Sequence, residues 1–277
     1  MNNLVNEINK IPKDEFNKLT AGKKIIIFDL DGTLTESKTD MDEEMAELFG
    51  KLLSIKQVAV IGGQQYSRFK EQFLNKLSVP EELFQNLYLF PTTATSFYRH
   101  INNDWHKHED SDWQKVYSQD LTEEEKTRIL DAFKKTFADI NYIQPEKIYG
   151  ELIEDRGTQM TFSALGQKAP LALKEKWKRE HADTKLKIAE ILRNYLPDME
   201  VGVAGWTSID VTHKGVDKEY GVKQIKENLG IDFEDMLFVG DALFPGGNDS
   251  AVLRTSVLCF EVKSVEDTKQ LIMELIS

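Results

Sequence analysis

The stretch that most constrains the fold of this chain is KIIIFDLDGTLT, residues 24–35. Its apolar run, residues 25–28, has the length of one strand and no polar face, which predicts a strand buried on both sides in a parallel sheet. Asp29 ends the run, and Asp31 follows two positions later, a spacing that directs both side chains to one side of extended backbone. Because open parallel sheets bind ligands at the carboxyl ends of their strands, the two acids are candidate site residues.

Segments that alternate between a short apolar strand and a helix lie on both sides of a middle region that lacks this alternation. Further short apolar runs, each expected to be a core strand, lie at residues 58–61, 87–90, 236–239 and 257–260. From about residue 95 the chain becomes rich in charged and aromatic residues, with an alternating segment at 158–165 and amphipathic helices, which is typical of an α+β region. Residues 1–22 are expected to be a short helical lead-in.

These patterns predict the α/β class: a Rossmann-like parallel-sheet core with an inserted α+β cap domain. The expected core consists of residues 1–94 and 214–277, and the expected cap of residues 95–213.

The net charge and the cysteine content limit which binding partners and which cellular location the sequence suggests. The net charge of −12 over 277 residues argues against a nucleic acid or an anionic membrane as the main partner. The one cysteine, Cys259, lies in the apolar run VLCF and is expected to be a core residue, so no disulfide can form within the chain. The first residues contain no apolar run like that of a signal peptide, and we expect a cytoplasmic protein.

Polar residues gather at the ends of four predicted core elements. Carboxylates from separate strand ends can share a hard cation such as Mg²⁺, and a lysine near them would neutralise a bound phosphate as a point charge. A glycine pair can bring backbone N–H groups close to an anion or can simply form a tight turn, and both interpretations stay open. The residues concerned are Asp29 and Asp31, Gly62 and Gly63, Lys218, and Asp241 with Asn248 and Asp249.

Taken together, four segments resemble the haloacid dehalogenase superfamily of phosphohydrolases and phosphomutases, in its C2-capped type IIB branch. They are DLDGTLT at 29–35, VIGG at 60–63, GVDK at 215–218 and GDALFPGGND at 240–249. Within that superfamily, the PGGND segment, the glycine pair and DRGT at 155–158 are most similar to the eukaryotic-type phosphomannomutases.

The resemblance implies a chemistry and a set of roles. Asp29 would be the nucleophile that forms an aspartyl-phosphate, and Asp31 the general acid and base. An oxygen of Asp29, the backbone carbonyl of Asp31 and Asp241 would hold Mg²⁺. The phosphate would be bound by Lys218, Thr33 and the backbone of Gly62 and Gly63. Asn248 and Asp249 would orient Lys218 and the metal-bound water.

The predicted cap departs from the phosphomannomutase pattern where a second phosphate would bind. Arg156 matches a cap arginine of that family, but Gln167 and Lys168 stand where its next arginine signature would fall, and Lys is not a bidentate phosphate partner. Ser208 and Asp210, by contrast, match residues that bind the sugar. These differences favour a sugar-phosphate phosphatase, with a phosphomannomutase-type phosphotransferase as the alternative and a non-catalytic phosphosugar-binding module as a third hypothesis.

Other features carry less weight. Gln64 and Gln65 replace the family's Ser or Asp after the glycine pair. His106 and His108, with His100 nearby, lie in so polar a segment that a solvated loop is favoured over a metal site. A homodimer formed through the cap is left open by the sequence.

Overall fold

The computed structural model describes residues 5–7, 10–36, 39–101 and 112–277, so the loop with His106 and His108 lies outside the described residues. The chain forms two compact units. The core unit consists of Met1–Ser118 and Asp217–Ser277, and the cap unit of Gln119–Val216. None of the described helices is long and apolar enough to cross a membrane.

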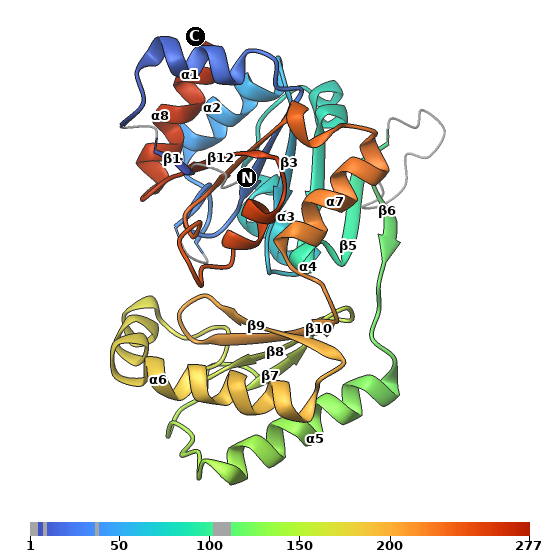
Figure 1. Ribbon diagram of the computed structural model, residues 1–277, viewed down its shortest axis with the longest axis vertical. Coiled ribbons are helices and arrows are strands. Elements are labelled where there is room, and N and C mark those ends of the chain that lie inside the picture. The colour runs from blue at the N-terminus through green and yellow to red at the C-terminus, as the bar shows by residue number, and fades with distance from the viewer. Residues whose placement is uncertain (1–4, 8–9, 37–38, 102–111) are drawn as a thin grey trace. The chain divides into compact units, whose positions relative to one another are not determined.

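An eight-stranded sheet forms the centre of the core unit, in the order β1-β12-β11-β2-β3-β4-β5-β6 (Figure 1). Neighbouring strands from β1 to β4 are parallel, whereas β4, β5 and β6 pair antiparallel. The strands are β1 (Val5–Glu7), β2 (Ile25–Asp29), β3 (Gln57–Ile61), β4 (Leu87–Phe90), β5 (Ser96–His100), β6 (Trp113–Ser118), β11 (Met236–Gly240) and β12 (Leu258–Glu261).

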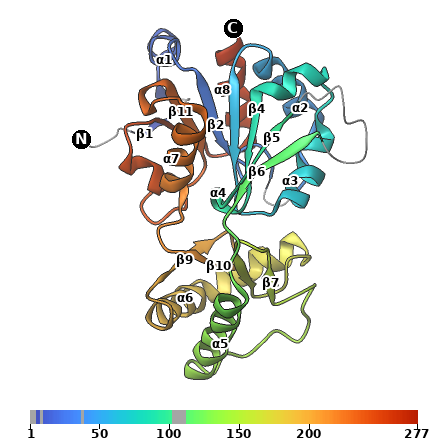
Figure 2. The ribbon, with the colours of Figure 1, turned by 90° about the vertical axis from the view of Figure 1, so that its right-hand side faces the viewer.

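Strand β2 is buried on both faces, as its continuous apolar run predicts. Ile26 and Phe28 belong to one apolar cluster, with residues of four helices: α1 (Lys13–Thr20), α2 (Glu43–Leu53), α3 (Tyr66–Gln72) and α8 (Val265–Ile276). Ile25 and Ile27 belong to a second cluster, with residues of α7 (Lys218–Leu229) and of the short turn α4 (Pro91–Ala94). Helices therefore cover both faces of the sheet (Figure 2), and the expected α/β fold class is confirmed.

Helix α7 begins directly after Asp217, which caps it. The Asp217 side chain accepts a hydrogen bond from the backbone N–H of Tyr220, which satisfies one free donor of the first turn. Lys218 is therefore the first residue of the helix, and it is buried.

The cap unit has its own four-stranded antiparallel sheet, in the order β7-β8-β10-β9. Its apolar cluster joins Phe162 and Ile209 of the sheet to Phe133 and Ile188 of the helices. Its elements are α5 (Glu123–Asp139), β7 (Ile153–Asp155), β8 (Met160–Ser163), α6 (Leu171–Tyr195), β9 (Met199–Ala204) and β10 (Ser208–His213).

Two expectations about segment boundaries differ from the structure. The cap was expected to begin at residue 95, but residues 96–118 belong to the core unit, because β5 pairs with β4 and β6 pairs with β5. The amino-terminal segment was expected to be a short helical lead-in, and α1 lies within it, but residues 5–7 form β1, which pairs in parallel with β12. Backbone pairing with a distant strand overrides the local preference there.

Candidate active site

The structure places Asp29 at the carboxyl end of the central strand. Its backbone pairs with Ile61, the last residue of β3, and on the other side β2 pairs with β11, which ends at Gly240. Asp241, directly after β11, therefore lies beside Asp29 at the same edge of the sheet. Asp29 is only 4% exposed, although it carries a carboxylate.

Lys218 joins two buried carboxylates. Its Nζ donates to Asp29 Oδ1 at 2.5 Å and to Asp249 Oδ1. The other oxygen of Asp249 accepts a hydrogen bond from the backbone N–H of Ala242 at 3.0 Å. Lys218 is 3% exposed and Asp249 is fully buried, so this bridge is shielded from water. It fixes the position of the ammonium group beside Asp29.

The electrostatics of this group follow from burial and from its one cation. Burial raises the pKa of Asp29 well above its usual range, although the Lys218 ammonium opposes the change. Burial and then the Asp249 carboxylate raise the pKa of Asp241 to about 6. Burial alone would lower the pKa of Lys218, but Asp249 and Asp29 outweigh it and raise that pKa. Lys218 is therefore a fixed positive charge among carboxylates that repel one another.

Three of these carboxylates could hold a metal ion. One oxygen each of Asp29, Asp241 and Asp249 lies within 4.8 Å of the others. An all-oxygen set of this kind suits a hard cation, and a cation would relieve the mutual repulsion that raises the pKa of Asp241. The expected ligands were an oxygen of Asp29, the backbone carbonyl of Asp31 and Asp241, and the structure adds the Asp249 side chain as a candidate.

Two glycines allow the acids to approach so closely. A Cβ on Gly32, whose φ is +91°, would lie 2.5 Å from Asp241 Oδ2. A Cβ on Gly240 would lie 2.3 Å from Asp249 Oδ2. Any larger residue at either position would push a carboxylate out of the group.

The side chain of Asp31 is held by a residue to which the sequence assigned no role. Gln64 donates from its Nε2 to Asp31 Oδ2 at 2.7 Å, and Gln64 is 7% exposed. Its place three residues after Ile61, the end of β3, was visible in the sequence, but the contact with Asp31 depends on how the two loops pack.

The expected phosphate-binding residues differ in whether their polar groups already have a hydrogen-bond partner. Thr33 is fully buried, and its Oγ1 has no hydrogen-bond partner among the described residues, so this hydroxyl is available to an anion. Gly62 is not available in the same way, since its N–H donates to the Phe90 carbonyl oxygen at 3.3 Å. A Cβ on Gly62 would also lie 2.9 Å from the Phe69 ring, which favours the tight-turn interpretation of this glycine. Gly63 follows it, partly exposed.

Of the two residues expected to orient Lys218, only Asp249 contacts it. Asn248 is exposed, and its side chain forms no hydrogen bond within the described part of the chain. Its expected role in orienting Lys218 and metal-bound water stays a prediction.

Within the cap unit, a polar row crosses the sheet. Asp210 of β10 pairs with Thr161 of β8, which pairs with Glu154 of β7. The Thr161 hydroxyl donates to Asp210 Oδ1 at 2.8 Å, and Arg156 donates from Nε to Glu154 Oε2 at 2.7 Å. Asp210 and Arg156, both expected to be substrate residues, thus lie on neighbouring parts of one sheet.

The other three cap residues differ in their surroundings. Ser208, two positions before Asp210 on β10, is 4% exposed, and its Oγ has no hydrogen-bond partner among the described residues. Gln167 and Lys168 follow β8 in a loop, where Lys168 is exposed and the Gln167 carbonyl oxygen accepts from Lys174 at 2.8 Å. Ser208 and Asp210 therefore share one face of β10, whereas Gln167 and Lys168 belong to the loop.

Comparison with known proteins decides the family. The family profile described as eukaryotic phosphomannomutase matches residues 45–277. The chain belongs to the eukaryotic phosphomannomutase family. It is 30% identical over 242 residues to a phosphomannomutase of Encephalitozoon cuniculi, covering 82% of this chain and 83% of that one. It is 28% identical over 259 residues to phosphomannomutase 1 of Mus musculus, covering 91% of each chain.

Solved structures support the fold. The N-terminally truncated IMP-nucleotidase of Plasmodium falciparum superimposes with a TM-score of 0.66 at 17% identity, over 94% of this chain and 72% of that one. Trehalose-6-phosphate phosphatase of Aspergillus fumigatus superimposes with a TM-score of 0.56 at 15% identity, over 99% of both chains. The family profile thus confirms the expected resemblance to the eukaryotic-type phosphomannomutases, and the two solved structures support the expected fold.

Family membership also bears on the activity expected from the sequence. It supports an enzyme of phosphoryl transfer on sugar phosphates, as expected. The names of the family members support the mutase alternative better than the phosphatase, which the cap residues had placed first.

Proposed function

We propose that the chain transfers a phosphoryl group of a hexose phosphate through Asp29, as a phosphomannomutase-type phosphotransferase. The observation that carries the proposal is the buried bridge from Asp29 through Lys218 to Asp249. One carboxylate oxygen of Asp29 is neutralised by the ammonium, which lowers the repulsion that an approaching phosphate dianion meets. The carboxylate then attacks phosphorus, and the P–O bond to the sugar breaks as the Asp29–phosphorus bond forms.

Asp31 is the general acid and base in this proposal. It protonates the leaving sugar oxygen and later removes a proton from the hydroxyl that accepts the phosphoryl group. The hydrogen bond from Gln64 to Oδ2 fixes the orientation of the Asp31 carboxyl group for this proton transfer. The free hydroxyl of Thr33 would donate to an oxygen of the phosphoryl group.

Mg²⁺ fits the acid group, and Asp29 and Asp241 would hold it together with Asp249 or with the backbone carbonyl of Asp31. When bound, Mg²⁺ would offset charge on the phosphoryl oxygens. The chain's own part is to hold the carboxylates close together, which the glycines at 32 and 240 permit.

The choice of acceptor separates two functions. The mutase is supported by the relatives' names, and it requires a sugar bisphosphate whose second phosphate is bound by cap cations. One observation favours the phosphatase instead: the Arg156 side chain is only 8% exposed and is already paired with Glu154, and the next family arginine position holds Gln167. Such a cap has less cationic charge to offer a second phosphate.

A parallel assay tests the proposal. Purified protein with Mg²⁺ receives the 1- and 6-phosphates of mannose and glucose, with and without a hexose bisphosphate, and ³¹P NMR follows isomerisation and inorganic phosphate together. We expect isomerisation that depends on the bisphosphate and exceeds phosphate release. Phosphate release without isomerisation would establish the phosphatase, and neither activity would leave only the binding module. Asp29→Asn is the control for both reactions.

Location and assembly belong to the same proposal. The absence of disulfide-forming cysteine pairs and the small sugar-phosphate substrate suit the cytoplasm. A homodimer through the cap stays a prediction, which light scattering on the purified protein tests.

A further inference from the structure

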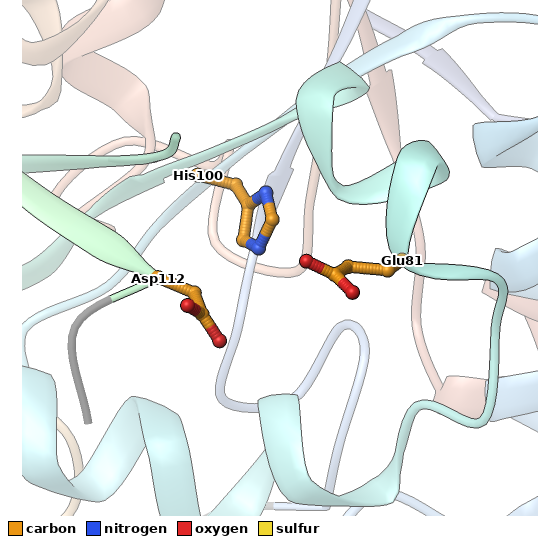
Figure 3. Close-up of side chains that lie close together, drawn as sticks. All are labelled: Glu81, His100 and Asp112. Atoms are coloured by element: carbon orange, nitrogen blue, oxygen red, sulfur yellow. The ribbon is translucent and has the colours of Figure 1, made fainter. Parts of the chain in front are cut away.

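Three side chains that can bind metals converge at an edge of the core unit's sheet, away from the acids described above. Glu81 begins a 3-10 helix (Glu81–Asn86), His100 ends β5, and Asp112 directly precedes β6. Figure 3 shows the imidazole of His100 facing the two carboxylates, with a ring nitrogen directed towards Glu81. One ligand atom of each residue lies within 4.8 Å of the others.

The position of this group excludes a part in phosphoryl transfer. Strand β5 is antiparallel to β4, and Arg99 pairs with Tyr88 near the start of β4. His100 therefore lies at the amino end of the parallel strands, whereas Asp29 lies at their carboxyl end. In the strand order, β3 and β4 also separate β5 from β2.

His100 is a buried polar side chain without a polar partner. It is 8% exposed, and its Nδ1 has no hydrogen bond in the described part of the chain. The rings of Phe84 and Trp113 each lie 5.6 Å from the imidazole, centroid to centroid, and hold it in place. The nitrogen that faces the carboxylates in Figure 3 is the other one, Nε2, and no hydrogen bond to it is formed within the described part of the chain either. The buried imidazole is thus held by aromatic rings with Nε2 open to a ligand between it and the two acids.

The two carboxylates lack cationic partners as well. Among the described residues, neither Glu81 nor Asp112 forms an ion pair with a lysine or arginine, and His100 forms none with either acid. Both acids are exposed, so their side chains can change rotamer freely. A tetrahedral zinc ion with ligands at about 2.0–2.2 Å requires the ligand atoms to be roughly 3.5 Å apart. The exposed acids need to move by about 1 Å to reach that distance, which a small rotation of their side chains provides.

We propose that Glu81, His100 and Asp112 form a binding site for a divalent transition-metal ion, with Zn²⁺ as its best occupant. One imidazole nitrogen and two carboxylate oxygens are ligands that Zn²⁺ accepts, and the imidazole disfavours Mg²⁺ and Ca²⁺. Three protein ligands leave a position for water. A bound ion would tie the 3-10 helix at Glu81 to the hairpin of β5 and β6.

Isothermal titration of the full chain with Zn²⁺ tests the site. The protein is first stripped with a chelator and then kept in millimolar Mg²⁺, so that the acids at Asp29 remain occupied by the hard cation. We expect one equivalent of Zn²⁺ to bind, with an affinity at least thirtyfold lower in Glu81→Gln and in Asp112→Asn. Both residues are exposed, so these variants should fold. Glu82→Gln, an exposed neighbour on the same 3-10 helix, is the matched control and should bind like the wild type.

Two further readouts separate this site from the active site and from other ligands. Zn²⁺ at a hundred times its dissociation constant should raise the Tm of the wild type by about 5 °C and leave the Tm of Asp112→Asn unchanged, while phosphoryl transfer stays equal in both. Equal Zn²⁺ affinity in the wild type, Glu81→Gln and Asp112→Asn would overturn the proposal. So would loss of binding in His106→Gln or His108→Gln without loss in those two variants, or displacement of Zn²⁺ by millimolar Ca²⁺.

Discussion

Gln64 donates a hydrogen bond from its side-chain Nε2 to Asp31 Oδ2, at 2.7 Å. The backbone around Gln64 is fixed too, because its carbonyl oxygen accepts from the N–H of Thr92 at 2.9 Å. This backbone hydrogen bond fixes the main chain from which the side-chain amide of Gln64 extends to Asp31. The side-chain hydrogen bond holds the Asp31 carboxyl group in one orientation, which suits a group that exchanges a proton with a sugar hydroxyl.

Replacing Gln64 by Met tests that relationship. Met has a similar length and no N–H, so Asp31 should lose its orientation while the packing is kept. We expect kcat to fall between about tenfold and a hundredfold with KM within about twofold, because the proton transfer and not ground-state binding is affected. Steady-state kinetics checks this. Gln65→Met, whose side chain does not cap the helix after it, should behave like the wild type. Equal kcat in both variants would remove Gln64 from the mechanism.

Asp29→Asn should abolish turnover while the protein stays folded. The amide keeps the shape of the side chain but cannot attack phosphorus. We expect kcat to fall by about 10³-fold or more, with an unchanged circular dichroism spectrum and a retained ability to bind substrate. Residual activity above about one part in a hundred would argue against covalent catalysis by this residue.

Asp241→Asn should change the requirement for metal. Burial and Asp249 raise the pKa of Asp241 to about 6, so its carboxylate is costly to ionise unless a cation is present. Removing this charge should raise the Mg²⁺ concentration for half-maximal activity by about tenfold to a hundredfold. A titration of activity against Mg²⁺ measures the change. An unaltered Mg²⁺ requirement would exclude Asp241 as a ligand.

Asp249→Asn should destabilise the fold through Lys218. Asp249 accepts from Lys218 and from the Ala242 N–H, whereas an amide has one accepting oxygen and would turn its NH₂ towards one of these donors. Since a buried charge then loses its partner, we expect the free energy of unfolding to fall by about 3 kcal/mol in urea denaturation. Asn248→Ala, at the exposed neighbouring position, should stay within about 0.5 kcal/mol of the wild type.

The sequence predicted those parts of the fold whose signal is local. Most of strand β2 is a continuous apolar run, so the sequence alone places Asp29 at the end of this strand and Asp31 just beyond it. Strand β1 has no such signal, because its three residues become a strand only by pairing with β12 at the far end of the chain. The boundary at residue 95 was misplaced for the same reason, since β6 is mostly polar and is held by its pairing with β5.

The same distinction applies to the site residues. Asp29, Lys218 and Asp241 lie in short motifs, and the structure brings Asp29 and Lys218 into contact. The hydrogen bond from Gln64 to Asp31 and the group of Glu81, His100 and Asp112 depend on where separate loops meet. A sequence pattern shows which residue types are present, but it does not show which side chains from separate loops contact one another.

Lys185 of the cap unit should make stability depend on pH in the alkaline range. It is 8% exposed on α6, and its Nζ donates to the Gly205 carbonyl oxygen at 2.7 Å. Burial, and then repulsion from Lys178, lower the pKa of Lys185 from 10.5 to about 8. The unfolded chain thus binds more protons than the folded one between these two values, so stability rises with pH across this window.

Lys185→Met should therefore stabilise the protein at neutral pH and not at high pH. Below pH 8 the wild type buries a charged ammonium, which lowers its stability by about 3 kcal/mol. The variant avoids this cost but loses the hydrogen bond to Gly205, which lowers its own stability by about 1 kcal/mol. We expect the variant to be about 2 kcal/mol more stable at pH 7, with this advantage lost as pH approaches 10.5. Urea denaturation across pH 7–10.5 measures it. Lys187→Met, exposed on the same helix, should show no such pH dependence, and a parallel response of the two variants would contradict the role assigned to Lys185.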